Sequence, residues 1–501
     1  MIRRFLTKIH TLALGLVCVL FLAPAAQAQV YNFVVAKDGS GTHTTIHAAI
    51  EAVRTNKPTR TLIFIKNGVY EEKLNARFIN LSLIGESREG VIISWNDYSG
   101  KPGPGGTNYT TATSYTLWAS ADDLYMENIT VRNTAGNVGQ AVAIRTTGDR
   151  QVFKNCTFLG FQDTYYAHSK RQYNLDCYVE GATDFIFGDA TTVFENSTIN
   201  CVEGGQYITA HNDTKLISKT TDNKDFYHGL LFLNCTITAN TGVPDNRYYL
   251  GRPWGSPGST AFINTRMGNH IRAEGWSTWS GNNHLSGTFA EYQSKDLAGE
   301  PLDVSQRVDW STQLTAEEVE AYYNLDYFLK KDNVIWDPRA ATESLPAPAE
   351  LTNNLYELTW QAVEGAKGYV ISRNNTAISF SEATTFTDTG VDPAIANTYH
   401  IQAVAENGNL SNTSNTVTVQ STVTSVKGDV AQAFQVKIED ARLTVSEKVD
   451  MEVYTFSGKL LKKAKNTTQL NLNSLEGGAL LIKLTNRKGE TVVKKFYLGG
   501  R

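Results

Sequence analysis

Short segments that alternate apolar and polar residues recur along the first two thirds of the chain. Each begins with Asn or Asp, continues with a small or apolar residue and then alternates β-forming side chains. Alternation with a period of two is typical of β-strands, and little helical periodicity separates the segments. The pattern predicts strands without the helical crossovers of a βαβ fold. The segments are INLSLIGES from Ile79, ENITVRNTAG from Glu127, KNCTFLGFQD from Lys154, LDCYVEGATD from Leu175, ENSTINC from Glu195 and LNCTITAN from Leu233.

The spacing of these segments indicates a solenoid. Asn128, Asn155, Asp176 and Asn196 follow one another at intervals of 27, 21 and 20 residues, and Asn234 comes 38 residues later. Irregular periods of about 20 residues suit stacked coils in which insertions form loops. We therefore expect an all-β chain that begins with a right-handed parallel β-helix over residues 29–340. Equivalent residues would stack in ladders about 4.8 Å apart.

The residue after each opening Asn or Asp forms one such ladder, namely Cys156, Cys177, Ser197 and Cys235. Small side chains stacked in the interior are a commoner use of such positions than catalysis or metal binding. No CxxC and no His pair with zinc-ligand spacing occurs, so we expect neither a metal site nor a cofactor. Spacing leaves open whether any of these cysteines, or Cys201, forms a disulfide.

The pattern changes after Pro338. The stretch PRAATESLPAPAEL is rich in proline and alanine and predicts a linker. Residues 341–421 then alternate cleanly, with Tyr399, Ile401 and Ala403 on one face. This segment resembles a fibronectin type III sandwich with Trp360 as its core aromatic residue, and either a spacer or a carbohydrate-binding role is open. Residues 422–501 again contain short strands and predict a second small β-sandwich.

Composition adds export to this picture. Basic residues Arg3, Arg4 and Lys8 precede an apolar run over residues 12–23, and small residues follow at Ala26 and Ala28. We interpret residues 1–28 as a secretory signal peptide, because the run is shorter than the roughly 20 residues of a spanning helix. The chain has 46 Lys and Arg against 50 Asp and Glu. This balance provides no field that would recruit nucleic acid.

Two aspartates repeat one interval from a cysteine. Asp163 follows Cys156 by seven residues, and Asp184 follows Cys177 by seven. If these cysteines are equivalent points on neighbouring coils, the two carboxyl groups stand side by side. Close carboxylates cannot both ionise cheaply, so one pKa should rise while the other stays low. Such a pair suits one proton donor and one anion, although an isolated Asp near a glycine is more often a turn former.

Four stretches around these aspartates carry a family resemblance. They are GQAVAIR (139–145), GFQDTYY (160–166), VEGATDFIFGDA (179–190) and LGRPWG (250–255). In this order and spacing they resemble the signature motifs of pectin methylesterases, and the likeness runs from about Tyr31 to the VIWDP stretch ending at Pro338. The resemblance implies a secreted carbohydrate esterase that hydrolyses C6 methyl esters of homogalacturonan to pectate and methanol.

The resemblance also implies roles for five residues. Asp184 matches the nucleophile that forms an acyl-enzyme, and Asp163 matches the general acid that later serves as base. Gln140 and Gln162 match amides that stabilise the oxyanion, although in a solenoid they could equally form an amide ladder. Arg252 matches the guanidinium that pairs with the nucleophile, where a surface ion pair is the ordinary alternative.

Further residues are expected to contact the sugar, because aromatic faces stack on pyranose C–H groups and cations favour free uronates. Each could equally be an ordinary core or solvated loop residue. His168, Lys170 and Arg171 supply candidate polar and cationic groups near the aspartates. The substrate-binding candidates are Trp254, Phe161, Thr111, Thr113 and Tyr165.

The end of the chain carries a second resemblance. The stretches VYTFSGKLLKK, LNLNSLEGGALLIKL and GETVVKKFYL within residues 422–501 are similar to the C-terminal sorting domain of the type IX secretion system. This implies that the type IX machinery is a partner and that the protein is secreted or held at the cell surface. We expect a monomer that binds methyl-esterified pectin. Two alternatives are a same-fold esterase or thioesterase for another acyl substrate, and a non-catalytic pectin-binding surface protein.

Overall fold

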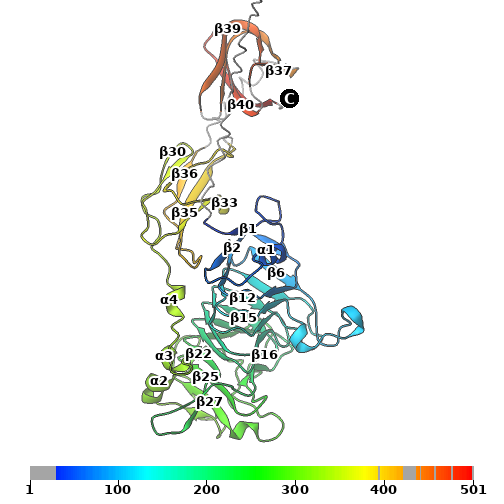
Figure 1. Cartoon of the computed structure of the whole chain (residues 1–501), viewed down its shortest axis with the longest axis vertical. Helices are drawn as coiled ribbons and strands as arrows, with labels where there is room; N and C mark the ends of the chain where they lie inside the picture. Colours follow the sequence, from blue (N-terminus) through cyan, green and yellow to red (C-terminus); the bar gives the residue numbers. More distant parts are fainter. Residues whose placement is uncertain are drawn as a thin grey trace, which may run out of the picture.

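Three parallel β-sheets, here named sheets A, B and C, build a solenoid in which each full coil visits A, then B, then C. The computed structural model describes residues 30–392, 395–420, 436–439, 442–455, 458–475 and 478–498. The predicted signal peptide and the second domain boundary near residues 421–435 lie outside these ranges. Figure 1 shows the solenoid followed by two smaller β units along one long axis. The expected parallel β-helix is confirmed.

Sheet A is the longest of the three, and all its neighbouring strands pair in parallel. Its strands are β1 (Phe33–Val35), β2 (Thr61–Ile65), β5 (Leu81–Gly85), β8 (Tyr125–Glu127), β11 (Gln151–Lys154), β14 (Arg171–Leu175), β17 (Thr191–Glu195), β22 (Leu230–Leu233), β25 (Gly258–Ile263), β27 (Gly287–Tyr292) and β29 (Thr312–Gln313).

Sheets B and C complete the coils. Sheet B contains β3 (Gly68–Tyr70), β6 (Val91–Trp95), β9 (Thr130–Asn133), β12 (Thr157–Leu159), β15 (Tyr178–Gly181), β18 (Thr198–Cys201), β23 (Thr236–Ala239), β26 (Arg266–Met267) and β28 (Lys295–Asp296). Sheet C contains β4 (Leu74–Ala76), β7 (Leu117–Ala119), β10 (Ile144–Thr146), β13 (Tyr165–Ala167), β16 (Thr183–Gly188), β19 (Tyr207–His211) and β24 (Tyr249–Gly251).

The Asn and Asp residues that mark the repeat form the corner between sheets A and B. Each has a positive φ, a left-handed conformation that Asn and Asp tolerate better than other residues with a side chain. Asn80 also has a positive φ, but it precedes β5 and therefore occupies the corner between sheets C and A. The first segment of the sequence pattern is thus out of phase with the rest. The A-to-B corner residues are Asn128, Asn155, Asp176, Asn196 and Asn234.

Stacked ladders fill the interior of the solenoid. Cys156, Cys177, Ser197 and Cys235 are buried after consecutive corners, as predicted, and Cys201 is buried as well. These four cysteines of the described residues are free thiols. A second interior ladder stacks Phe194 on Phe232 and Phe232 on Phe262, with ring centroids 5.1 and 4.4 Å apart.

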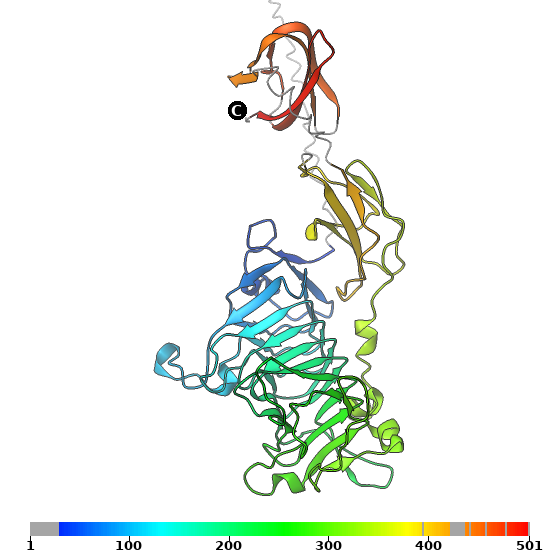
Figure 2. The same ribbon diagram turned by 180° about the vertical axis from the view of Figure 1, so that it is seen from behind.

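Helices cover the first coil and the outer face of sheet A. α1 (Ile46–Ala52) buries its apolar residues beside β1 and β4. α2 (Ala316–Tyr322) and α3 (Leu325–Phe328) lie beside the last coils, and α4 (Arg339–Thr342) leads to the middle domain (Figures 1 and 2). Among the described residues, no helix has both the length and the apolarity needed to cross a membrane.

The middle domain consists of two antiparallel sheets. One contains β30 (Thr352–Asn354), β31 (Glu357–Thr359) and β34 (Thr385–Thr387), and the other contains β33 (Thr376–Ser381), β32 (Gly368–Arg373), β35 (Asn397–Val404) and β36 (Val417–Val419). Trp360 is buried between them with Tyr399, Ile401 and Ala403, as the alternation predicts.

The segment predicted as a linker is instead packed on the solenoid. α4 lies against β11, and Arg339 forms an ion pair with Glu195 at 2.8 Å. The middle domain itself places Phe380 against Tyr31 and Phe64, with ring centroids 5.3 and 5.0 Å apart. The middle domain therefore covers apolar surface on the first coils of sheet A.

The C-terminal unit is a separate antiparallel sheet with its own core. Its long strand β38 (Arg442–Thr455) pairs with β37 (Val436–Glu439), β39 (Leu460–Asn471) and β40 (Gly478–Thr485), and β41 (Thr491–Leu498) pairs with β40. Register shifts interrupt the β38–β39 pairing, and apolar residues such as Met451 and Val453 are buried.

The left-handed corners generate the first prediction. Asn196 is exposed, has φ of 52° and precedes β18, so an Asn196→Ala change tests backbone conformation with little loss of packing. We expect it to destabilise the solenoid by about 1–2 kcal/mol, while Asn196→Gly stays close to wild type because glycine tolerates positive φ. Urea unfolding followed by tryptophan fluorescence measures the difference. Equal stability of the Ala and Gly variants would contradict the corner argument.

Candidate active site

The coil register brings Asp163 and Asp184 together at the entrance to sheet C. The backbone of Gln162 forms a parallel β-bridge with that of Thr183, and Tyr165 pairs with Ile186 in the strand register. The two aspartates therefore occupy equivalent positions one coil apart. Both are buried, and both have positive φ, 65° for Asp163 and 48° for Asp184. Unusual backbone conformations of this kind cost free energy and often occur at functional sites. The side-by-side placement predicted from the repeated 21-residue interval is confirmed.

Arg252 fixes one of the two carboxylates. Its Nε donates to Oδ1 of Asp184 at 2.9 Å, and its Nη2 donates to Oδ2 at 2.6 Å. Two parallel charge-assisted hydrogen bonds hold both the position and the plane of a carboxylate. Arg252 directly follows β24, and its backbone N–H donates to the carbonyl of Thr209.

Two aromatic rings from different parts of the chain pack against the guanidinium of Arg252. Its central carbon lies 3.8 Å from the ring centroid of Tyr207 and 3.9 Å from that of Trp279. Sequence reasoning missed both rings. Tyr207 pairs with Thr183 in the register of sheet C, which is a signal the motif comparison did not use. Trp279 lies in a loop beyond β24, where no repeat indicates its neighbours.

Burial and charge give the two carboxyl groups different pKa values. Burial raises the pKa of Asp163 well above its usual range, the charge of Asp184 raises it further, and Arg252 opposes both effects. Burial also raises the pKa of Asp184, against the hydrogen bonds and charge of Arg252. The expectation that Asp184 would keep a low pKa is therefore wrong, because burial outweighs the ion pair. The expected asymmetry remains, because the pKa of Asp163 is raised more strongly than that of Asp184, which Arg252 contacts directly.

Two amides flank the pair. Gln140 bridges Gln162, which in turn bridges Thr183, so the backbones of these residues form a short ladder beside the aspartates. Both glutamines are partly exposed, and neither side-chain amide has a hydrogen-bond partner among the described residues. Their N–H groups are therefore available to a ligand.

A row of rings follows the outer face of sheet C. Trp254 is 36% exposed, and its ring centroid lies 6.0 Å from that of Phe187. Phe187 stacks on Tyr166 at 4.3 Å, and Tyr166 stacks on His168 at 4.5 Å. These four rings are called the aromatic row below. Because Trp254 comes two residues after Arg252, the row begins beside the aspartates.

Tyr165 is wrong as a substrate-binding candidate. Its side chain is fully buried inside the solenoid, and its hydroxyl donates to Oδ1 of Asn174 at 3.1 Å. Side chains alternate between the two faces of a strand, so its neighbour Tyr166 takes the outer face and belongs to the aromatic row. Lys170 and Arg171 also lie away from the aspartates, since they pair with Asp122 and Asp149.

Thr111 and Thr113 lie in a short 3-10 turn, η2 (Thr111–Thr113), near one end of the row. Arg145 links the two features, because its Nη1 donates to the carbonyl of Ala112 and its Nε bonds Nδ1 of His168. Phe161 is half-buried in the loop before Asp163. Among the described residues, no group of three or more His, Cys, Asp or Glu is arranged to hold a metal.

Comparison with known proteins identifies the family of the solenoid. Residues 32–332, more than half of the chain, match the family model described as Pectinesterase. The chain belongs to the pectinesterase family. Residues 412–498 match the model of a secretion system C-terminal sorting domain, which confirms the second resemblance and begins within the middle domain.

Relatives and solved structures agree with this membership. Pectinesterase 31 of Arabidopsis thaliana is 36% identical over 292 residues, which cover 57% of this chain and 88% of that protein. Pectinesterase 5 of the same plant is 37% identical, over 56% of this chain and 47% of its own length. Several of these relatives are longer, and this pectinesterase-family chain spans about half of their length.

The fold comparison points the same way. A pectin methylesterase from carrot superposes with a TM-score of 0.53 and 30% identity, covering 60% of this chain and 93% of that one. The pectin methylesterase of Erwinia chrysanthemi gives 0.51 and 29%, covering 62% and 98%. The solenoid of this pectinesterase-family chain therefore contains nearly the whole matched fold, and the middle and C-terminal domains are additions to it.

The ion pair generates the second prediction. Arg252→Gln removes the only group named above that lowers the pKa of both aspartates, so both values should rise. Carboxyl-carbon NMR titration of the wild type and the variant measures this change. Lys57→Gln, at an exposed lysine on another loop, is the control for loss of one positive charge. An unchanged titration in Arg252→Gln would contradict the effect of Arg252 on the two pKa values.

Burial of Asp163 generates the third prediction. The pKa of Asp163 is higher in the folded than in the unfolded chain, so this group has no effect on stability at low pH, where both states are protonated. As the pH rises from the unfolded toward the folded pKa, the free energy of unfolding falls by about 1.4 kcal/mol per pH unit. Asp163→Asn removes this loss, so the variant should gain stability over the wild type as the pH increases. Unfolding midpoints at pH 5 and pH 8 test this. A difference that does not vary with pH would contradict it.

Proposed function

We propose that this chain hydrolyses the C6 methyl esters of homogalacturonan and releases pectate and methanol. One observation carries the proposal. The Asp184 carboxylate, held in plane by Arg252, stands beside Asp163, whose pKa burial raises well above its usual range, with two unpartnered amides next to them. Family membership supports an ester substrate, and the aromatic row with its exposed Trp254 supports a sugar polymer.

The first chemical step uses both aspartates. An oxygen of Asp184 forms a bond to the C6 carbonyl carbon, and the negative charge moves to the carbonyl oxygen. In this proposal the side-chain N–H groups of Gln140 and Gln162 donate to that oxygen, a stabilisation of about 3 kcal/mol for one such donor in other enzymes. The carbon–methoxy bond then breaks, and the proton of Asp163 goes to the departing oxygen to give methanol.

The second step restores the enzyme. Asp163, now ionised, takes a proton from a water molecule, and the water oxygen bonds to the carbonyl carbon of the acyl-enzyme. The bond between that carbon and Asp184 breaks, which restores the original protonation states of both aspartates and leaves a galacturonic acid that loses its proton to solvent. Arg252 keeps Asp184 a good leaving group and returns its carboxylate to the attacking position, while Tyr207 and Trp279 restrain the guanidinium.

The fourth prediction tests the roles of the two aspartates by methanol release from highly methylated pectin in the presence of EDTA. Asp184→Ala should lose nearly all activity, and Asp163→Asn should lose about 10²–10⁴-fold, the usual contribution of acid–base catalysis. Asp176→Asn is the matched control, because it also changes an Asp with positive φ, at a corner away from the site. Undiminished methanol release by Asp184→Ala would remove the nucleophile from the mechanism.

The same assay separates the alternative activities. Methanol formed without new reducing ends or unsaturated products supports a methylesterase. Binding of pectin without methanol release would favour a non-catalytic surface protein, and turnover of a different acyl ester or thioester alone would favour another esterase. Activity should fall at low pH as Asp184 is protonated and at high pH as Asp163 ionises, giving a bell-shaped profile.

We also propose that the protein leaves the cell through the type IX machinery. The match of residues 412–498 to a sorting-domain model supports this, as does the separate core of the C-terminal sheet. A chain ending at residue 420 should keep a folded solenoid but stay inside the cell, as measured by fractionation against the full chain. Equal export of both chains would contradict the proposal.

A further inference from the structure

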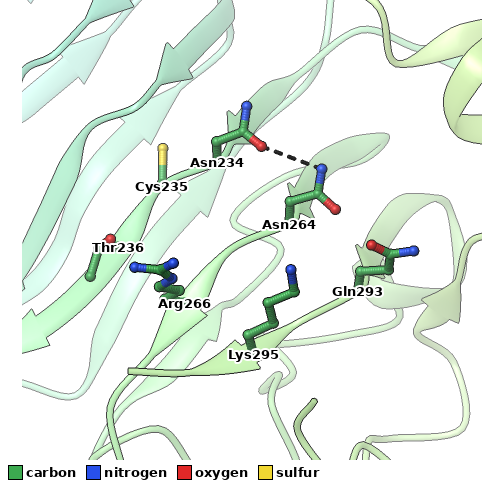
Figure 3. Close-up of a pocket in the computed structure, with 7 residues that line it drawn as sticks. All are labelled: Asn234, Cys235, Thr236, Asn264, Arg266, Gln293 and Lys295. Atoms are coloured by element: carbon green, nitrogen blue, oxygen red, sulfur yellow. Dashed lines mark hydrogen bonds between the residues drawn. The ribbon is translucent and has the colours of Figure 1, made fainter. Parts of the chain in front are cut away.

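A hollow of about 420 Å³ lies at the corner between sheets A and B in the last coils (Figure 3). Asp163 and Asp184 lie at a different corner, where the chain enters sheet C. Its lining follows from coil stacking. Asn234, Asn264 and Gln293 are successive corner residues with positive φ, and together they form a ladder of three amides. The hollow is within the usual size range of ligand sites, about 300–1,000 Å³.

A second ladder runs beside the amides. Two residues after each corner, Thr236 pairs with Arg266, and Arg266 pairs with Lys295 in the parallel register of sheet B. Two cations therefore occupy neighbouring rungs, about 4.8 Å apart along the solenoid. Figure 3 shows the ammonium group of Lys295 between Arg266 and Gln293, facing the amide of Asn264.

These cations have no counter-charge. Among the described residues, neither Arg266 nor Lys295 makes an ion pair or a hydrogen bond through its side chain, and Lys295 is half-buried. The neighbouring coils behave differently, since Arg307 pairs with Glu291 at 2.8 Å. Like charges on adjacent rungs repel each other, so an anion placed between them would be stabilised. The chain as a whole has a net charge of −4, which makes this local excess of positive charge unusual for its surface.

The chemistry of the lining selects a class of anion. A guanidinium and an ammonium group bind carboxylates, while a row of amides can both donate to and accept from sugar hydroxyls. A ligand that carries both groups on each unit is a polyuronate. We propose that this hollow is a second binding site for demethylated galacturonan, and this rests on the proposed function because that polymer is the product of the reaction. Product binding there would hold the enzyme on the polymer during repeated turnover.

The test measures binding of unmethylated trigalacturonate to the full chain by calorimetry, which requires no turnover. Arg266→Gln with Lys295→Gln should weaken binding at this site about tenfold or more, and remaining binding should belong to the site at Asp163 and Asp184. Arg54→Gln with Lys57→Gln, which removes two exposed cations elsewhere, should leave affinity unchanged. Methanol release from a short methylated oligomer should be normal in both double variants.

Two results would overturn the proposal. One is unaltered stoichiometry and affinity for trigalacturonate in the Arg266/Lys295 double variant. The other is equal displacement of trigalacturonate by inorganic sulfate at matched ionic strength, which would reduce the hollow to an unspecific anion site. If methanol release fails in the wild type while the double variant still loses trigalacturonate binding, the proposed function fails and the binding site stands.

Discussion

The in-register stacking of parallel coils is the constraint on which the rest of this structure depends. Backbone hydrogen bonds between neighbouring strands of the same sheet set residues one coil apart into contact, whatever their side chains are. This places two carboxyl groups side by side at positions 163 and 184. In a flexible chain, repulsion between two carboxylates would keep them apart. The same stacking aligns Arg266 with Lys295. Functional groups of like charge are thus held together by a scaffold that gains its stability elsewhere.

That scaffold separates stability from chemistry. The interior is filled by stacked apolar ladders, and the outer face of sheet A is covered by helices and the middle domain. Sheet C is left to carry the aspartates and the aromatic row. Burial of Asp163 and Asp184 costs free energy at neutral pH, so the apolar ladders and the covered face of sheet A have to supply the stability of the fold. The charge of Arg252 opposes the effect of burial at both carboxyl groups, but its two hydrogen bonds go to Asp184 alone, and the difference between the two groups follows from these bonds.

Ladders were predictable from the sequence, and contacts between loops were not. The 21-residue interval predicted the placement of Asp163 and Asp184, because register is a property of the backbone. The same reasoning failed at Tyr165, since a left-handed residue at Asp163 precedes the strand and the motif alone does not tell which of two adjacent tyrosines faces outward. Trp279 reaches Arg252 from a loop, where no period applies. The proline- and alanine-rich stretch predicted a linker, and its composition alone does not report the apolar surface on which it packs.

Apolar residues on the outer face of sheet A also explain why the middle domain packs against the solenoid. A solenoid strand exposes one side chain in two, and in sheet A many of the outward residues are apolar, including Phe64 and Ile84. An exposed strip of this kind along a parallel sheet would favour association between copies. Phe380 covers its first coils, and α2 and α3 cover its last ones. The additional domain therefore completes the surface of the solenoid on sheet A and leaves sheet C, which carries the aspartates and the aromatic row, uncovered by it.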